Sequence, residues 1–176
     1  MGIIDRFFSL FRRRGGSTAP APVDVEPRGS GALRGAVTVS SRVFDKLVPE
    51  MQVKGDRFLQ ECLTRNLDVL VYCTLRTLDE QDALYAKGRT APGDIVTNAR
   101  GGQSAHNWGL AFDAVPRVGG KAIWGESIDG PLWQTFGLCA KVAGLEWGGD
   151  WKFKDAPHCQ MPGWRDYVKR TQGVEV

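Results

Sequence analysis

The sequence predicts an α+β fold in which a small antiparallel sheet is flanked by helices. Segments with helical periodicity are interspersed with short apolar runs, without the regular strand-helix-strand alternation of a parallel sheet. The chain has 176 residues, of which 42% are hydrophobic and 10% aromatic, enough to build one core. We therefore expect one folded domain preceded by an N-terminal extension.

The N-terminal extension divides into two parts. Residues 1–14 place apolar side chains at helical spacing with arginines on the other side, which predicts a short basic amphipathic helix. Two alternatives remain open for this helix: contact with an anionic membrane surface, or a frayed tail that docks on its own domain. Residues 15–38 are rich in Gly, Pro, Ala and Ser, which is typical of a flexible linker. The folded domain is then expected over residues 39–176.

The distribution of charge argues against nucleic acid as a partner. The formal net charge of the chain is +3, and residues 1–14 alone account for it, so the remainder is nearly neutral. A phosphate-binding domain carries its Lys and Arg on the folded part. The first residues also lack the order of charged and apolar residues of a secretory signal, and no run approaches the roughly 20 apolar residues of a membrane span. The chain is therefore expected to lack its own export route and to stay in the cytoplasm until it is released.

The first half of the domain predicts a helix, a strand and a second helix. The first helix shows one apolar face, the run Leu67–Cys73 is short and β-branched as in a buried strand, and Thr77 with Glu80 forms a capping box for a helix that should stop at Gly88. Arg76 then lies at a strand-to-helix junction. The residues of the first helical face are Phe58, Leu59, Cys62 and Leu63.

The second half predicts a loop, a strand and one more helix before a turn-rich end. The segment 93–102 is polar and punctuated by glycine, as in a loop. The later helix should begin near Pro131 and end at Gly144. The four cysteines contain no CxxC pair, so free buried thiols are expected. The apolar face of the later helix consists of Leu132, Phe136, Cys139, Ala140 and Ala143.

The chain has only two histidines, and each has an aspartate nearby. Asp113 follows His106 by seven residues, and Asp155 precedes His158 by three. Two histidines and one carboxylate are a common set of protein ligands for a catalytic zinc ion, which keeps a fourth position for water. Mn, Co and Ni bind similar ligands. The alternative is that these residues are ordinary polar groups.

A change of chain direction is required to bring His106 and Asp113 together. In an unbroken strand, residues seven apart lie on opposite faces. Gly109 is the expected turning point, after which Asp113 shares a face with Gly109 and Ala111 while Phe112 faces the core.

The segment Asp155-Ala-Pro-His158 is expected to be extended, because Pro157 disfavours helical backbone at Ala156. His158 and Gln160 would then point one way and Cys159 the other, which makes Cys159 a poor ligand candidate. Asp155 remains open to three roles: a ligand, a partner that orients a histidine, or a general base, the group that a peptidase needs.

These residues resemble the motifs of the D-Ala-D-Ala metallopeptidase family. The segment 104–113 (SAHNWGLAFD) is similar to the SxHxxGxAxD signature of that family, and the segment 155–158 (DAPH) resembles its second signature. Further segments at 76–81, 84–90 and 93–98 resemble the L-alanoyl-D-glutamate endopeptidases of bacteriophage lysins. The resemblance runs from about residue 69 to residue 160 and leaves the N-terminal extension uncovered.

The resemblance implies a Hedgehog/DD-peptidase fold with one zinc ion on His106, Asp113 and His158. It also implies Asp155 as the general base and Arg76 as a group that binds the substrate carbonyl and stabilises the oxyanion. Ser104 is implied to line the site. On the residues alone, Arg76 would be interpreted as a surface ion-pair residue and Ser104 as a turn residue.

The implied activity is cleavage of the L-Ala-D-Glu bond in the stem peptide of peptidoglycan by a monomeric phage or prophage endolysin, which would reach the cell wall after release from the host cytoplasm. Two alternatives stay open. One is a D,D-carboxypeptidase or D-Ala-D-Ala dipeptidase of the same family. The other is a non-catalytic wall-binding module that keeps zinc for structure.

Overall fold

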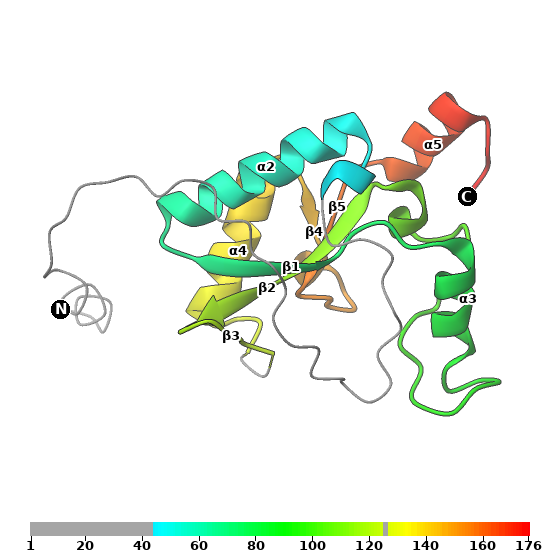
Figure 1. The fold of residues 1–176 in the computed structure, drawn as a ribbon, viewed down its shortest axis with the longest axis horizontal. Helices are drawn as coiled ribbons and strands as arrows, with labels where there is room; N and C mark the ends of the chain where they lie inside the picture. Colours follow the sequence, from blue (N-terminus) through cyan, green and yellow to red (C-terminus); the bar gives the residue numbers. More distant parts are fainter. Residues whose placement is uncertain (1–43, 125–126) are drawn as a thin grey trace, which may run out of the picture. The chain divides into compact units, whose positions relative to one another are not determined.

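A computed structural model describes residues 44–124 and 127–176 of the chain (Figure 1). The expected amphipathic helix at 1–14 and linker at 15–38 lie outside the described residues. No helix in the described ranges is both long and apolar enough to span a bilayer. The helices are α2 (Pro49–Thr64), α3 (Leu78–Ala86), α4 (Pro131–Val142) and α5 (Trp164–Gln172), with 3-10 turns η2 (Phe44–Lys46), η3 (Ala105–Trp108) and η4 (Gly148–Asp150). The strands are β1 (Asp68–Cys73), β2 (Ala111–Val118), β3 (Lys121–Ala122), β4 (Glu146–Trp147) and β5 (His158–Gln160).

The strands form one five-stranded sheet in the order β1-β2-β5-β4, with β3 paired to β2. Every pairing is antiparallel. This arrangement, with helices interspersed along the chain, confirms the predicted α+β class. β2 lies between β1 and β5, and Asp113 of β2 is paired with a residue of each.

One face of the sheet is covered by helices α2 and α4. Phe58 of α2 packs against Phe112 of β2 at 5.3 Å between ring centroids and against Phe136 of α4 at 5.0 Å. All three rings are fully buried. Because side chains alternate across a strand, the inward orientation of Phe112 turns Asp113 to the other face of β2. The helical layer therefore leaves one sheet face for polar residues.

The helices predicted within 44–124 and 127–176 are confirmed, with one difference of detail at Leu63. Helix α3 has Thr77 as its N-cap, and Thr77 and Glu80 form the expected capping box. The helix ends at Ala86, just before Gly88, which has a positive φ of 69°. The expected apolar face of α2 is buried at Phe58, whereas Leu63 is 67% exposed.

Two expectations about strands were wrong. β1 is not a buried strand. Among the described residues it lies at the edge of the sheet and pairs with β2 alone, and Leu70 in it is 39% exposed. The segment from Asp155 to His158 is a turn, closed by the backbone N–H of His158, which donates to the carbonyl oxygen of Asp155 at 3.1 Å. Extended backbone begins only at His158.

Gly109 is the turning point between η3 and β2, as predicted. It lies in the left-handed region at φ 66° and ψ 29°. A Cβ at this position would meet the backbone at the end of η2 and the start of α2 at 3.2 Å, at the carbonyl oxygen of Lys46 and the nitrogen of Val48. The carbonyl oxygen of Gly109 also accepts a hydrogen bond from the backbone N–H of Val48 at 3.1 Å.

Gly109→Ala is therefore expected to destabilise the fold by more than the roughly 1–2 kcal/mol that left-handed backbone costs an ordinary residue. Gly119→Ala is the matched control, because Gly119 has a similar φ of 58° and no atom within 4 Å of the added carbon. Urea denaturation of both variants measures the difference. Equal losses at the two positions would contradict the importance of the contact with η2.

Candidate metal centre

Three adjacent strands bring Cys73, Asp113 and His158 into one row across the sheet. Asp113 of β2 pairs with Cys73 of β1 on one side and with His158 of β5 on the other. A register shift between Val71 and Cys73 makes Cys73, and not Tyr72, the partner of Asp113. The turn at Gly109 then folds η3 back so that His106 reaches the same place.

His106, Asp113 and His158 converge at three atoms. Nε2 of His106 lies 3.2 Å from Oδ1 of Asp113 and 3.2 Å from Nδ1 of His158, and that Nδ1 lies 3.1 Å from the same Oδ1. Two ligand atoms about 2.05 Å from a zinc ion and separated by the tetrahedral angle are about 3.3 Å apart. The three atoms therefore have the spacing of one face of a tetrahedral zinc site. All three residues are at most 9% exposed.

The outer nitrogen of each imidazole is bonded to an oxygen that can only accept. Nδ1 of His106 lies 2.7 Å from the carbonyl oxygen of Thr74, so it carries a proton and donates. Nε2 of His158 lies 3.0 Å from Oε1 of Gln160, which likewise requires a proton on Nε2. In the neutral imidazoles the inner nitrogens are then unprotonated, and their lone pairs face a carboxylate oxygen. A cation bound between these three acceptor atoms would remove the repulsion among their lone pairs.

The charges of the three residues suit a cation. Although burial alone would raise it, the neighbouring His106 and His158 hold the pKa of Asp113 well below its usual range. Burial lowers the pKa of His106, which favours its neutral form. Burial alone would lower the pKa of His158, but the hydrogen bond to Asp113 raises it. A metal held by these residues would compete with the proton that His158 takes up, so its binding would weaken at low pH.

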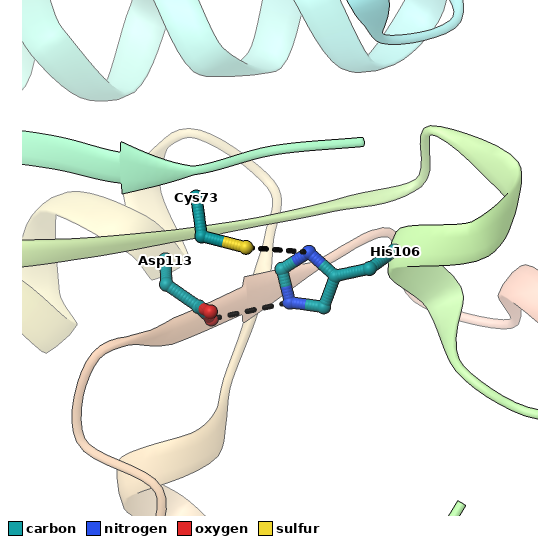
Figure 2. A group of neighbouring side chains, drawn as sticks. All are labelled: Cys73, His106 and Asp113. Atoms are coloured by element: carbon teal, nitrogen blue, oxygen red, sulfur yellow. Dashed lines mark hydrogen bonds and ion pairs between the residues drawn. The ribbon is translucent and has the colours of Figure 1, made fainter. Parts of the chain in front are cut away.

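Cys73 is the other group near this cluster that could bind a metal (Figure 2). Its Sγ lies 3.7 Å from Nδ1 of His106, while Asp113 lies beside Nε2, the other ring nitrogen. Nδ1 is already engaged with Thr74, so Cys73 and Asp113 contact different ring nitrogens. Burial raises the pKa of the Cys73 thiol to about 12. The thiol is thus a weaker ligand candidate than His158.

Arg76 lies beside the cluster at the end of β1. Its Nη2 is 3.6 Å from Oδ2 of Asp113 and donates to Sγ of Cys73 at 3.2 Å. Its Nη1 donates to Oε1 of Gln81 at 2.8 Å, and the Gln81 amide donates in turn to the carbonyl oxygen of Ala99 at 2.8 Å. Nε of Arg76 is buried without a partner within 44–124 and 127–176. The guanidinium is therefore held against Asp113 and oriented by the fully buried Gln81.

Asp155 lies at the rim of the cluster, not within it. Its residue is exposed, and its position is fixed through the backbone, since its N–H donates to the carbonyl oxygen of Gly148 at 2.9 Å. A Cβ on Gly148 would lie 2.5 Å from the carbonyl oxygen of Asp155 and 3.2 Å from Cβ of His158, so only glycine allows this approach. Protein atoms that exclude water raise the pKa of the Asp155 carboxyl, and His158 opposes the increase.

Ser104 is the N-cap of η3, two residues before His106. Its backbone N–H donates to Oδ1 of Asn107 at 3.3 Å, and its carbonyl oxygen accepts from the backbone N–H of Asn107 at 2.9 Å. These bonds shape the turn that carries His106. Ser104 is therefore close to His106 along the chain, and its backbone hydrogen bonds are those of an N-cap.

The sequence did not reveal the groups that orient the candidate ligands. Thr74 acts through a backbone carbonyl, which carries no side-chain signal. Gln81 is buried against a loop 18 residues away, so its role depends on a long-range contact. Gln160 offered one signal, because its position two residues after His158 on a strand places both side chains on the same face.

Two family profiles match the chain, both described as D-alanyl-D-alanine carboxypeptidase. They match residues 45–127 and 97–161. The chain is 43% identical over 122 residues to a Bacillus subtilis (strain 168) protein named peptidoglycan L-alanyl-D-glutamate endopeptidase, a match that covers 65% of this chain and 73% of that protein. It is 31% identical over 130 residues to the L-alanyl-D-glutamate peptidase of Listeria phage A118, covering 73% of this chain but only 42% of the phage protein.

Solved structures show the same fold at lower identity. An L-Ala D-Glu endopeptidase from Serratia marcescens aligns with a TM-score of 0.51 at 24% identity, covering 70% of this chain and 86% of that chain. A vancomycin-resistance D,D-dipeptidase in complex with a D-Ala-D-Ala phosphinate analogue aligns with a TM-score of 0.50 at 17% identity, covering 73% of this chain and 56% of that chain. These likenesses confirm the predicted fold.

Proposed function

Because the chain belongs to the D-Ala-D-Ala metallopeptidase family, we propose that it cleaves the L-Ala-D-Glu bond in the stem peptide of bacterial peptidoglycan. The observation that carries this proposal is the 43% identity to a peptidase named for that bond, over 73% of its length. One zinc ion is proposed at His106, Asp113 and His158. The triangle of three atoms with edges of 3.1–3.2 Å supports this ligand set.

When bound, zinc would make a water molecule acidic near pH 7 and polarise the scissile carbonyl. Asp155 is the proposed general base, which takes the proton of the attacking water and gives it to the leaving amine. The pKa of Asp155 is raised toward neutral pH, which makes its carboxylate a better proton acceptor. Its exposed position at the rim leaves it accessible to water and substrate.

Arg76 is the proposed oxyanion partner. Its guanidinium lies 3.6 Å from Asp113 and is oriented by Gln81. A fixed donor aimed at the developing charge commonly contributes about 3–4 kcal/mol to transition-state stabilisation. Covalent catalysis by a thiol is not part of the proposal, because burial raises the pKa of Cys73, the cysteine nearest the candidate ligands, to about 12. Ser104 is proposed to line the site beside η3.

A second candidate is cleavage of a terminal D-Ala residue. It is favoured by the description of both matching profiles as D-alanyl-D-alanine carboxypeptidase. The metal ligands would be the same in either case, and the substrate contacts would differ.

The similarity to the phage A118 peptidase supports the proposal that the protein is a lysin that is released to the cell wall.

Digestion of purified peptidoglycan separates the two activities. The zinc-loaded protein is expected to generate new N-terminal D-glutamate, identified by mass spectrometry of the soluble fragments. Removal of the metal with a chelator should stop the reaction, and added zinc should restore it, because the ligand set holds a Lewis acid that no side chain replaces. Release of D-Ala without new D-glutamate termini would instead establish the carboxypeptidase activity. Zinc-loaded protein that digests no wall would favour a binding module.

A further inference from the structure

Behind His158, a second row of polar side chains crosses the sheet. Gln160 of β5 pairs with Glu146 of β4, and Gln160 lies two residues beyond His158 on the same face. Nε2 of His158 is 3.0 Å from Oε1 of Gln160, and Nε2 of Gln160 donates to Oε2 of Glu146 at 3.1 Å. Nε1 of Trp151 donates to Oε1 of Glu146 at 2.6 Å. Four side chains therefore form one continuous hydrogen-bonded chain.

The direction of every bond in this chain is fixed by its outer end. An indole N–H can only donate and a carboxylate can only accept, so both oxygens of Glu146 are committed, one to Trp151 and one to Gln160. Gln160 must therefore present its NH2 group to Glu146 and its oxygen to His158. That oxygen requires a proton on Nε2 of His158. In the neutral ring the proton is then absent from Nδ1, the nitrogen that faces His106 and Asp113.

The two candidate histidine ligands are thus controlled by different means. His106 is fixed by the backbone carbonyl of Thr74 at 2.7 Å, which no substitution removes. His158 depends on side chains alone. Trp151 acts on it twice, since its ring also packs against the imidazole at 5.1 Å between centroids. The orientation of His158 can therefore be changed by mutation without replacing the histidine.

We propose that Gln160, Glu146 and Trp151 form a positioning relay that fixes the tautomer of His158 and aims its Nδ1 at the metal. This inference rests on the proposed metal site. The relay residues do not contact the metal or the substrate. Their effect is on the free energy of metal binding, because the wrong tautomer of His158 must be converted before it can act as a ligand.

Reversal of the relay provides the test. In Glu146→Gln, one of the two committed oxygens becomes an NH2 group that faces a donor. In Gln160→Glu, two carboxylates face each other. Glu146→Gln is expected to weaken zinc binding about 10- to 100-fold, because the Gln160 amide then turns its NH2 group toward His158. Gln160→Glu keeps an acceptor for Nε2 of His158, so it is expected to weaken binding by a smaller factor, through repulsion between the two carboxylates. In the double variant, the new carboxylate at 160 accepts from both His158 and the amide at 146, and the amide oxygen still accepts from Trp151. Zinc affinity is expected to return to within a few-fold of that of the unmodified protein.

Zinc dissociation constants are measured by competition with a chromophoric chelator, and cobalt(II) absorption reports the coordination geometry. Trp151→Phe keeps an aromatic ring against His158 but removes the indole N–H, and it should weaken zinc binding by a smaller factor. This variant replaces a charge variant that fails to fold. Glu61→Gln is the matched control. Glu61 lies on α2 and pairs with Arg65, the C-cap of that helix, so this variant is expected to leave zinc affinity unchanged.

Unchanged affinity in Glu146→Gln would overturn the relay, as would a double variant that binds no better than Glu146→Gln. An unmodified protein that binds no zinc would instead refute the proposed metal site.

Discussion

His106→Ala is expected to abolish zinc binding and peptidoglycan hydrolysis together. The substitution removes one of the three converging atoms, and the 3.2 Å contacts from Nε2 to Asp113 and His158 are lost with it. Two protein ligands remain, which is fewer than the three that catalytic zinc sites use. The metal content of the dialysed protein, measured by mass spectrometry, and the rate of wall digestion report the two losses.

Cys73→Ala is the control for His106→Ala. It removes the other possible ligand of the cluster while it leaves all three proposed ligands in place. The variant is expected to keep one zinc ion per chain. Loss of zinc from Cys73→Ala and its retention in His106→Ala would show that the ligand set is wrong. Comparison of the metal-free proteins by urea denaturation separates a lost ligand from a lost fold.

Asp155→Asn is expected to keep zinc and to lower kcat by about 100- to 10,000-fold, the usual contribution of a general base. The amide has nearly the same shape as the carboxylate but cannot take a proton from water. Because Asp155 is anchored through its backbone N–H to Gly148, the turn that precedes His158 should persist. Steady-state kinetics and metal content are measured on the same preparation.

Asp150→Asn is the matched control for Asp155→Asn. Asp150 is an exposed aspartate five residues earlier, and it pairs with Lys141 on the surface at 3.1 Å. The kcat of Asp150→Asn should equal that of the unmodified protein. The base must be ionised to act, so the activity of the unmodified protein should fall as the pH decreases through the raised pKa of Asp155. If Asp155→Asn emptied the site of zinc, Asp155 would be a ligand and the proposed division of roles would be wrong.

Local sequence signals predicted the parts of the fold that local contacts determine. The capping box at Thr77 and the glycine at 109 act through neighbouring backbone atoms, so their residue types were sufficient to place a helix start and a turn. A turn at Gly109 was also predicted to bring His106 and Asp113 together, because two residues seven apart in one continuous strand would lie on opposite faces.

Contacts between distant segments limited the prediction of the site. The proline at 157 predicted extended backbone, but the Asp155 N–H bonds to Gly148 of η4 and the segment turns. The row of Cys73, Asp113 and His158 depends on strand register across three segments, which spacing along the chain does not encode. The relay behind His158 was missed for the same reason, because Glu146 reaches Gln160 only through the pairing of β4 with β5.

The row of side chains across the sheet also links metal binding to stability. The proposed ligands come from η3, β2 and β5, and their atoms are close together only when these elements are folded and paired. An ion that binds the folded chain but not the unfolded chain stabilises the fold by RT ln(1 + [M]/Kd), where [M] is the free ion concentration. This is about 4 kcal/mol when [M] is 1,000 times Kd. Metal supply would then determine how long the folded protein persists as well as whether it turns over.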